Sequence, residues 1–335
     1  MKKIIKKVTE SKLTVLETQA ASHLIKTTFA QALSKEIGLT KVSAPLFLDE
    51  ASGLQDNLNG IEPPVAFRTA TGEKCQIVHS LAKWKRHAIA KYEVPVGKGI
   101  YADMMAVRTT EDLDSIHSYY VDQWDWEASI KKSERNFETL KKYVTKIVGA
   151  LAATQEVVLK KYPELQRVIA KKPIKFITTQ ELEDRWPKLS SKEREHAIAR
   201  EYKGTLFISQ IGGKLKSGKI HDGRSPDYDD WSLNGDIVIY YPPFDSSLEL
   251  SSMGIRVDAV ALKSQLAERK ALDRMKYDFH KKLLAETLPF TIGGGIGQSR
   301  VCMVLLNKTH IGEVQASQWS DEVVSDAKKR KIALL

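Results

Sequence analysis

The sequence predicts an α+β fold in which a central antiparallel β-sheet is flanked by helices. Short apolar strands recur along the 335 residues without the regular strand–helix–strand spacing of a doubly wound parallel fold. Two long stretches, residues 11–36 and 127–161, carry apolar residues at helical spacing. The hydrophobic content of 42% is sufficient to bury a substantial core.

The first third of the chain supplies a helix and several short strands. The helix over residues 11–36 is amphipathic, and Gly38 is well placed to end it. We expect a strand carrying Pro45 over residues 38–48, and two short strands on either side of a turn at 71–73. Ser80 then caps a short helix, SLAKWKRHAIA.

The rest of the chain alternates strands with helices. Alternating apolar residues predict strands at MMAVR and HSYYVDQWDWE, and one long helix or two abutting helices follow over residues 127–161. Polar helical stretches, including residues 258–286, then separate four further strands, IKFITT, GTLFISQI, DIVIYYP and ELSSMGIRV. No repeat, low-complexity tract or Pro/Ser-rich linker interrupts this order.

The composition favours a cytoplasmic protein. No stretch approaches the roughly 20 apolar residues of a membrane span, and no apolar region follows the basic N-terminus MKKIIKKVTE, so we expect neither a membrane anchor nor a secretory signal. The cysteines, Cys75 and Cys302, are too few for a disulfide framework or a zinc site. The net charge of +10 comes from lysines dispersed as pairs, which is more typical of solvated faces than of nucleic-acid binding.

The stretch TIGGGIGQSRVCMVLL, residues 291–306, combines glycines with an arginine at the start of an apolar helix. Glycines permit unusual backbone geometry and the close approach of another molecule. Arg300 would stand at the helix N-terminus, where backbone N–H groups favour an anion. The stretch matches neither the P-loop nor the dinucleotide fingerprint. The alternative is a glycine-rich turn into a buried helix with a solvated arginine.

The strand YVDQWDWE would have two different faces, because side chains alternate along a strand. Val121, Gln123, Asp125 and Glu127 would share one face, and Tyr120, Asp122, Trp124 and Trp126 the other. The first face offers an amide and two carboxylates, which favours a lined cavity, whereas the second is mostly aromatic packing. A strand with one solvated face is the alternative.

Carboxylates elsewhere suggest a cation site. In ELSSMGIRV the alternation places Glu249, Ser251, Met253 and Ile255 on one face, and Ser252 and Arg256 on the other. Glutamate with nearby hydroxyls suits a hard cation such as Mg²⁺, although an exposed edge strand is the alternative. Asp236 opens an apolar strand, where its burial would require a metal or a basic partner.

Two charged stretches can each be interpreted either as part of a site or as a solvated surface. PDYDDW carries Asp227, Asp229 and Asp230, which could bind a cation, attract ammonium or form an acidic loop. In HSLAKWKRH, Lys83 and His87 could share a helical face and Lys85 would lie on another, although a basic surface helix is the simpler interpretation.

The order of these segments resembles the three motifs of class II aminoacyl-tRNA synthetases. GLTKVSAPLFL is similar to motif 1, GIYADMMAVR followed by HSYYVDQWDWE to motif 2 with Arg108, and ELSSMGIRV followed by GGGIGQSR to motif 3 with Arg300. The fuller strings QDNLNG, VHSLAKWKR, YVDQWDWE, PDYDDW, LNGDI, ELSSMGIRVD and TIGGGIGQSR resemble the ammonia-dependent asparagine synthetases, or aspartate–ammonia ligases. The resemblance extends from about residue 38 to residue 315, with a loose match around 155–200.

The resemblance implies a single class II synthetase-like catalytic domain over residues 1–335, with a sheet of six to eight strands, working as a cytoplasmic homodimer. It also implies that L-aspartate, ATP and ammonia give L-asparagine, AMP and pyrophosphate through a β-aspartyl-adenylate, with Mg²⁺ as the cation.

The resemblance further implies residue roles at the nucleotide. Arg108 would hold the α-phosphate and the reacting carboxylate, and Arg300 the terminal phosphate of a bent ATP. Asp236 and Glu249 would bind magnesium, with Ser252 as a further oxygen donor. Arg256 and Gly295 complete the expected ATP site.

At the amino acid, the resemblance implies that Ser80, Lys85 and Gln123 line the aspartate pocket and that Asp125 orients the amino group. Ser251 and Ser252 are further expected substrate contacts. Asp56 and Asp229 are candidates for holding ammonium and accepting its proton, because ammonia must lose a proton in forming an amide.

Three alternative classes of protein fit the sequence less well. An aspartyl- or asparaginyl-tRNA synthetase would need an anticodon-binding domain, for which the residues before 38 and after Arg300 leave no room. A non-catalytic tRNA-binding relative would not need both motif arginines and the carboxylates. A glutamine-dependent asparagine synthetase would need cysteine after Met1, where this chain has Lys2.

Overall fold

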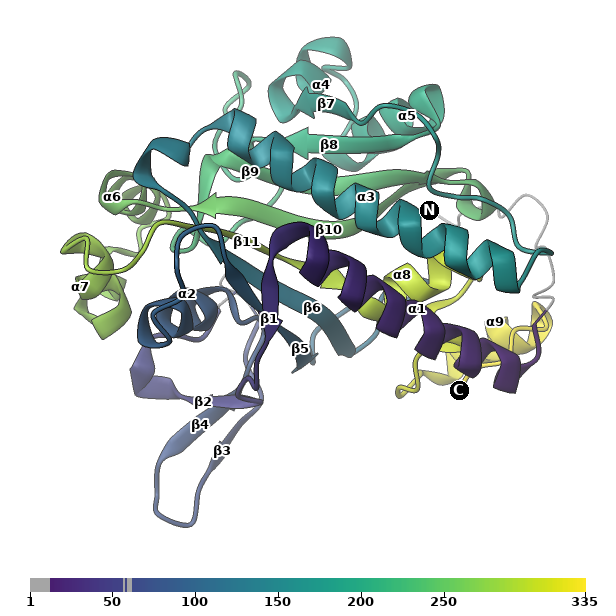
Figure 1. Ribbon diagram of the computed structural model, residues 1–335, viewed down its shortest axis with the longest axis horizontal. Helices are drawn as coiled ribbons and strands as arrows, with labels where there is room; N and C mark the ends of the chain where they lie inside the picture. The colour runs from purple at the N-terminus through teal and green to yellow at the C-terminus, as the bar shows by residue number, and fades with distance from the viewer. Residues whose placement is uncertain (1–12, 57, 59–61) are drawn as a thin grey trace.

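The computed structural model describes residues 13–56, 58 and 62–335. In this part of the chain the main sheet has eight strands in the order β1-β5-β6-β11-β10-β9-β8-β7 (Figure 1). Their bounds are β1 Leu39–Lys41, β5 Gly99–Val107, β6 Tyr120–Ser129, β7 Lys175–Thr178, β8 Thr205–Ser209, β9 Asp229–Tyr241, β10 Ser246–Arg256 and β11 Thr291–Gly297.

The predicted antiparallel sheet is confirmed for the six central strands, which lie in the order β5-β6-β11-β10-β9-β8. The two edge pairs differ, because β1 runs parallel to β5 and β7 parallel to β8. Helices α4 (Thr179–Arg185) and α5 (Ser191–Tyr202) carry the chain from β7 to β8, and such a crossover makes neighbouring strands parallel.

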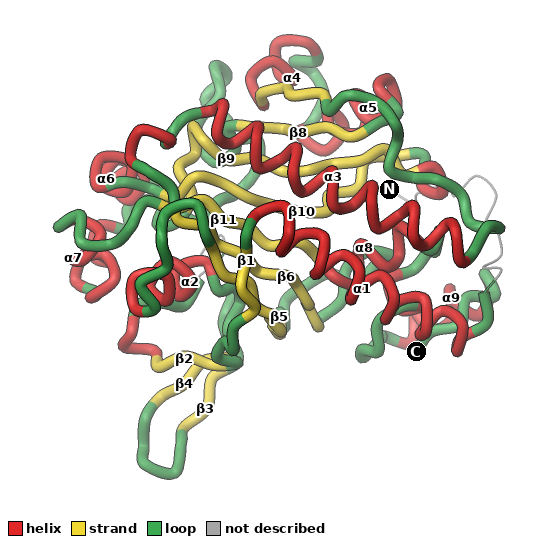
Figure 2. The backbone as a smooth tube through the Cα atoms, in the orientation of Figure 1, coloured by secondary structure: helices red, strands yellow, loops and turns green. Residues whose placement is uncertain are grey.

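Helices α1 (Val15–Ile37) and α3 (Phe137–Lys161) lie side by side across one face of this sheet (Figures 1 and 2). The expected first helix is confirmed, and Gly38 ends it with φ of 82°. It begins at Val15 with Thr14 as its N-cap, later than the expected start at Ser11, a residue that lies outside the described part of the chain. The expected second helix is shorter than predicted, because residues 127–129 belong to β6 and Asn136 caps α3.

The aromatic face of β6 packs beneath these two helices. Trp124 contacts Phe29 of α1 with ring centroids 4.5 Å apart, and Trp126 stacks on Tyr143 of α3 at 5.8 Å. Both tryptophans are buried. The opposite face of β6, with its amide and carboxylates, is therefore free to line a site, as the alternation predicted.

A second, three-stranded sheet projects from the main one (Figure 1). It consists of β2 (Phe47–Asp49), β3 (Ala66–Arg68) and β4 (Lys74–Ile77). The two strands expected around residues 71–73 are confirmed as β3 and β4. The single strand expected over residues 38–48 is wrong, because the chain divides at Pro45 into β1 of the main sheet and β2 of the small one. Proline has no N–H to donate to a sheet, which suits this break.

The remaining helices surround the sheet. They are α2 Ala82–Lys91, α6 Ala259–Glu268, α7 Asp278–Leu284, α8 Gln298–Leu305 and α9 Asp321–Lys329, with 3-10 turns at Glu50–Ser52, Lys132–Glu134, Pro242–Phe244, Leu272–Lys276 and Ile311–Glu313. Within the described residues no helix is long and apolar enough to span a membrane.

Candidate active site

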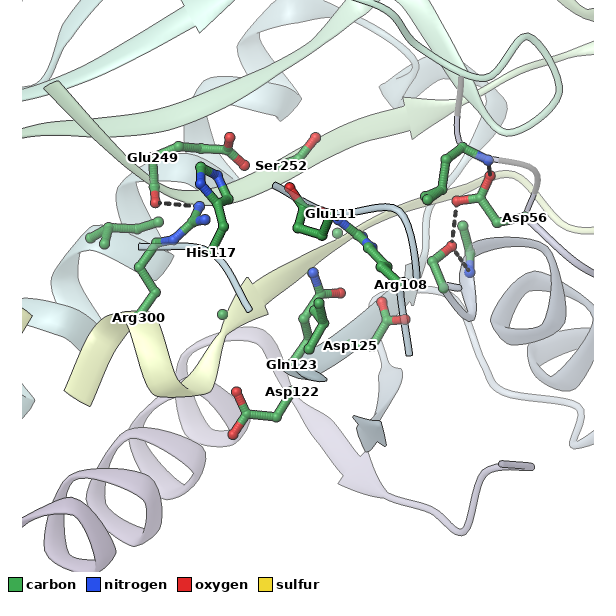
Figure 3. Close-up of a pocket in the computed structure, with 18 of the residues that line it drawn as sticks. Asp56, Arg108, Glu111, His117, Asp122, Gln123, Asp125, Glu249, Ser252 and Arg300 are labelled. Carbon is green, nitrogen blue, oxygen red and sulfur yellow. Dashed lines mark hydrogen bonds and ion pairs between the residues drawn. The ribbon is translucent and has the colours of Figure 1, made fainter. Parts of the chain in front are cut away.

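A cavity of about 400 Å³ opens on the face of the sheet opposite α1 and α3 (Figure 3). Strands β6, β10 and β11, the loop after β5 and the segment 222–229 form its walls. Most of the predicted site residues line it: Asp56, Ser80, Arg108, Gln123, Asp125, Asp229, Glu249, Ser252, Arg256, Gly295 and Arg300. Lys85, Asp236 and Ser251 are not among the lining residues.

Asp125 is held from below. One carboxylate oxygen accepts a hydrogen bond from the backbone N–H of Leu81 at 2.9 Å, and the other pairs with Lys85. Lys85 is 1% exposed and also donates to the carbonyl oxygens of Trp126 at 2.9 Å and Gly294 at 3.3 Å. Burial lowers the pKa of the Lys85 ammonium despite the nearby carboxylates. Lys85 therefore supports Asp125 from behind and does not line the pocket as expected.

The helix that carries Lys85 is not a solvated surface. Lys83, Lys85 and Arg86 of α2 are all buried, so the interpretation of this segment as a basic surface helix is wrong. Ser80 does not cap α2, whose N-cap is Leu81. The Ser80 hydroxyl instead donates to Asp56.

The glycines of residues 293–297 lie in strand β11 and not in a loop or turn. None of these glycines has a positive φ in the structure. The sequence therefore does not need glycine here for unusual backbone geometry. A Cβ on Gly293 would lie 2.1 Å from Glu127 Oε2, and one on Gly295 would lie 2.2 Å from Gln123 Oε1. The expected close approach is thus made by side chains of β6, and Gly295 also borders the cavity.

A buried arginine joins three strands at the cavity wall. Arg256 Nε contacts both carboxylate oxygens of Glu127 at 3.0 Å, Nη2 donates to Oε2 at 2.6 Å, and Nη1 pairs with Asp229. Burial would lower the pKa of Arg256, but the two carboxylates more than offset it and raise that pKa. The guanidinium is therefore engaged by protein carboxylates, so Arg256 supports Asp229 at the cavity wall, and its predicted place in the ATP site stays a prediction.

Asp229 itself remains at the cavity, and burial raises its pKa despite the pairing with Arg256. The other carboxylates of PDYDDW serve structural pairs: Asp227 with Lys83, Arg274 and His280, and Asp230 with Arg135. The interpretation of this motif as a solvated acidic loop is therefore wrong.

Asp56 stands at the far end of the cavity from Arg300 (Figure 3). Its carboxylate accepts hydrogen bonds from the Ser80 hydroxyl at 2.7 Å and from the backbone N–H of Leu58 at 2.8 Å. Gln55 Oε1 accepts from the backbone N–H of Asp56 at 3.1 Å. Other residues of the QDNLNG string, Asn57, Asn59 and Gly60, lie outside the described part of the chain.

The two motif arginines face the cavity from different elements. Arg108 follows β5, contacts Glu111 only at 3.9 Å, and has a buried Nε without a hydrogen-bond partner among the described residues. Arg300 is in the first turn of α8, as predicted, and donates to the carbonyl oxygens of Glu249 at 3.0 Å and Ile116 at 3.4 Å. Between them the site offers two guanidinium groups to an anionic ligand.

Strand β10 departs from strict alternation. A β-bulge between Glu249 and Ser251 shifts its pairing with β9. Glu249 therefore lines the cavity together with Ser252, whereas the expected partner Ser251 is buried away from it. The predicted face assignment for Glu249 and the substrate contact of Ser251 are wrong for this reason.

Asp236 has the basic partner that its burial required. Arg224, which lines the cavity, pairs with Asp236 and also with Asp222 at 2.9 Å. Burial raises the pKa of Asp236 to about 7. Its Oδ1 atom is buried and, within the described chain, accepts no hydrogen bond.

Several lining residues were missed by the sequence reasoning. They are Arg224, Tyr228, Glu111, His117 and Asp122. The burial cost of Asp236 was the signal that could have found Arg224, since it demanded a nearby cation. Glu111 and His117 sit in the loop between β5 and β6, where no periodic pattern places a side chain.

This fold is that of the class II aminoacyl-tRNA synthetases. The asparaginyl-tRNA synthetase of Pyrococcus horikoshii, solved with asparaginyl-adenylate, aligns with a TM-score of 0.64 at 15% identity over 90% of this chain and 70% of that one. The corresponding Entamoeba histolytica enzyme, also solved with asparaginyl-adenylate, gives 0.62 at 14% identity over 90% and 66%.

Sequence comparison is more specific than the fold. A family model described as aspartate-ammonia ligase matches residues 16–331. A Clostridium perfringens protein named aspartate–ammonia ligase is 54% identical over 325 residues, covering 96% of each chain. A Fusobacterium nucleatum protein of the same name is 54% identical over 97% of this chain and 99% of its own. The chain belongs to the aspartate-ammonia ligase family and is a ligase.

Proposed function

We propose that this enzyme joins L-aspartate and ammonia into L-asparagine at the expense of ATP, releasing AMP and pyrophosphate through a β-aspartyl-adenylate. The observation that carries the proposal is the arrangement of the cavity. Arg108, whose Nε has no hydrogen-bond partner among the described residues, lies between the Gln123–Asp125 face of β6 and the carboxylate of Asp56, and Arg300 closes the opposite end (Figure 3).

Activation solves a chemical problem. A carboxylate is a poor electrophile because its oxygen is a poor leaving group, and joining it to the α-phosphate of ATP makes AMP the leaving group. Arg108 would hold the α-phosphate and the β-carboxylate together, since a planar guanidinium can bind two anions. Arg300 would bind the terminal phosphate, and together they would offset the charge that develops at phosphorus.

Magnesium fits this end of the cavity. Among the described residues no group of three or more His, Cys, Asp and Glu side chains is placed to hold a metal ion. Mg²⁺, however, commonly uses one or two carboxylates together with phosphates and waters. Glu249 of the cavity wall would hold it, with Ser252 nearby. Asp236, which is not a lining residue, would contribute its buried Oδ1, an atom that accepts no hydrogen bond from the described residues. When bound, the ion would neutralise phosphate charge.

The amino acid would lie on β6. Asp125, oriented by Leu81 and Lys85, would receive the α-amino group of aspartate. Gln123 would contact the β-carboxylate as it is activated, and Ser80 lines the same end of the cavity. Because Lys85 supports Asp125 from behind and does not line the cavity, the Asp125 carboxylate faces the cavity and can receive an ammonium group.

Ammonia would enter beside Asp56. The carboxylate of Asp56 would attract ammonium and accept a proton. The ammonia nitrogen then forms a bond to the β-carbonyl carbon, the bond from that carbon to the phosphate oxygen breaks, and AMP leaves with the electron pair. The new amide nitrogen loses one further proton, for which Asp56 and the nearby Asp229 are the candidate acceptors.

We also propose a cytoplasmic homodimer. Helix α1 and the segment after it carry exposed apolar side chains, with Leu16 80% and Leu46 50% exposed, which a second copy would cover. Both cysteines are free and buried, which suits a reducing compartment. Solution scattering should give twice the monomer mass of 37.7 kDa, and a monomeric mass would contradict the dimer.

The test of the function is direct. Purified protein is incubated with ATP, aspartate and ammonium, and AMP, pyrophosphate and asparagine are quantified. We expect the three products in equal amounts. ADP in place of AMP would overturn the adenylate, and AMP without asparagine would overturn the ammonia step.

A further inference from the structure

A network of buried polar side chains, centred on Asp122 of β6, lies in the wall of the cavity. We propose that Asp122 is a positioning residue that fixes Arg300 for the phosphates of ATP, by anchoring the first turn of α8. The inference rests on the proposed function, because it concerns where the phosphates bind.

Asp122 makes three contacts with the start of α8 and with α1. Its Oδ1 accepts from the backbone N–H of Ser299 at 3.0 Å, and its Oδ2 accepts from the Ser299 hydroxyl at 2.8 Å. Lys26 Nζ of α1 donates to the same Oδ2 at 2.9 Å. Ser299 directly precedes Arg300, so these contacts hold the backbone from which that arginine extends.

The network also reaches the loop that begins with Arg108. Gln315 Nε2 donates to the Ser299 hydroxyl at 3.0 Å and lies 3.4 Å from Asp122 Oδ1. Its Oε1 accepts from the hydroxyl of Ser118 at 2.6 Å, and Ser118 lies in the loop between β5 and β6, two residues before β6 begins. A single buried cluster therefore connects the chain segments that carry Arg108 and Arg300.

The charge of Asp122 matters as well as its shape. A carboxylate at a helix N-terminus interacts favourably with the helix dipole. Burial opposes the charge of Lys26, but the Asp122 carboxylate more than offsets this and raises the pKa of that ammonium. Asp122, Ser299, Ser118 and Gln315 are all buried, so the contacts are little screened by water.

The decisive variant is Asp122→Asn, which keeps the size of the side chain but removes its charge and one acceptor oxygen. We expect the Kd of ATP, measured by calorimetry without aspartate, to rise about tenfold, because small displacements of a binding group cost one to two orders of magnitude. We expect the KM of aspartate to stay within about twofold, since the residues proposed to bind aspartate, Gln123 and Asp125, lie on the other face of β6.

A double-mutant cycle separates positioning from general damage. In an Arg300→Ala background, Asp122→Asn should change the Kd of ATP by less than about twofold, because the group it positions is gone. Asp258→Asn is the matched control. Asp258 also caps a helix, accepting from Val260 and Ala261, and pairs with Arg135, but it does not line the cavity. It should lower stability and leave ATP binding unchanged.

Each possible result either supports or refutes the positioning role of Asp122. Independent effects of Asp122→Asn and Arg300→Ala, or equal increases in the ATP and aspartate constants, would overturn the positioning role. If Asp122→Asn does not fold, Ser299→Ala replaces it, since this change removes only the hydroxyl contacts and should weaken ATP binding in the same direction. If the wild-type protein neither binds ATP nor makes asparagine, the proposed function fails, whereas normal ATP binding by a folded variant refutes only the role of Asp122.

Discussion

Replacing Gly293 by alanine should cost at least about 4 kcal/mol of the free energy of unfolding. The new methyl carbon would lie 2.1 Å from Glu127 Oε2 and 2.6 Å from both Arg256 Nη2 and the carbonyl oxygen of Trp126. Ordinary contact starts at 3.4 Å, so the carboxylate would have to retreat by about 1.3 Å. That movement separates it from Arg256 Nη2, which it contacts at 2.6 Å.

Two costs combine to give this magnitude. Overpacking a core costs about 1–3 kcal/mol, and breaking a buried ion pair costs about 3–5 kcal/mol. The Trp126 carbonyl belongs to the neighbouring strand and cannot move aside as a flexible side chain would. Because Arg256 also holds Asp229, the cavity should lose its shape together with stability.

Urea unfolding, followed by circular dichroism, measures the change. The control is Gly149→Ala in the middle of α3, where an added Cβ has no atom within 4 Å. That variant should gain about 0.5–1 kcal/mol, because alanine is the better helix former. A Gly293→Ala protein within 1 kcal/mol of the wild type, with the control behaving as expected, would refute the packing argument.

Two further predictions concern the site, and a third concerns the buried His310. Arg108→Ala should reduce pyrophosphate exchange by at least about 10²-fold with circular dichroism unchanged, and near wild-type exchange would show that the phosphate assignment is wrong. Asp56→Asn should retain pyrophosphate exchange while asparagine formation falls by roughly 10²–10⁴-fold, and equal losses in both half-reactions would place Asp56 at the amino group of aspartate. Burial and the nearby Arg330 lower the pKa of His310 from 6.5 to about 4. The folded state therefore binds fewer protons at His310 than the unfolded state does. The contribution of His310 to the free energy of unfolding should be fully present above pH 6.5 and should be lost as the pH falls toward 4. His310→Asn, which keeps an acceptor for the Gly312 N–H, should flatten that fall in urea unfolding, and an unchanged slope would contradict it.

The sequence was informative where a local rule holds without exception. Side chains alternate along β6, so the separation of Gln123 and Asp125 from Trp124 and Trp126 could be predicted from the letters alone. The position of Arg300 in the first turn of a helix could also be predicted from the neighbouring residues alone. In β10 the same rule failed, because the bulge that brings Glu249 beside Ser252 is set by pairing with β9 and leaves no mark in the alternation.

Long-range partners explain what the sequence did not reveal. Lys85 was expected at the substrate, but Asp125, 40 positions away, draws it under the strand. Alternation placed Asp122 on the aromatic face, but it could not reveal the partners Lys26 and Ser299, which are 96 and 177 positions distant. Asp236 shows the useful exception, since the cost of burying a carboxylate predicted a cation before Arg224 was known to supply it.

The place of β11 has a consequence for synthesis of the protein. Residues 291–297 lie between β6 and β10 and join the two parts of the main sheet. Until this segment leaves the ribosome, β6 and β10 each have one unpaired edge, and open edges invite pairing with other chains. Arg300 and the β11 glycines that border the cavity leave the ribosome within the same short interval. A ribosome-bound chain ending at residue 290 should therefore depend on chaperones and have no activity, however long it is given to fold.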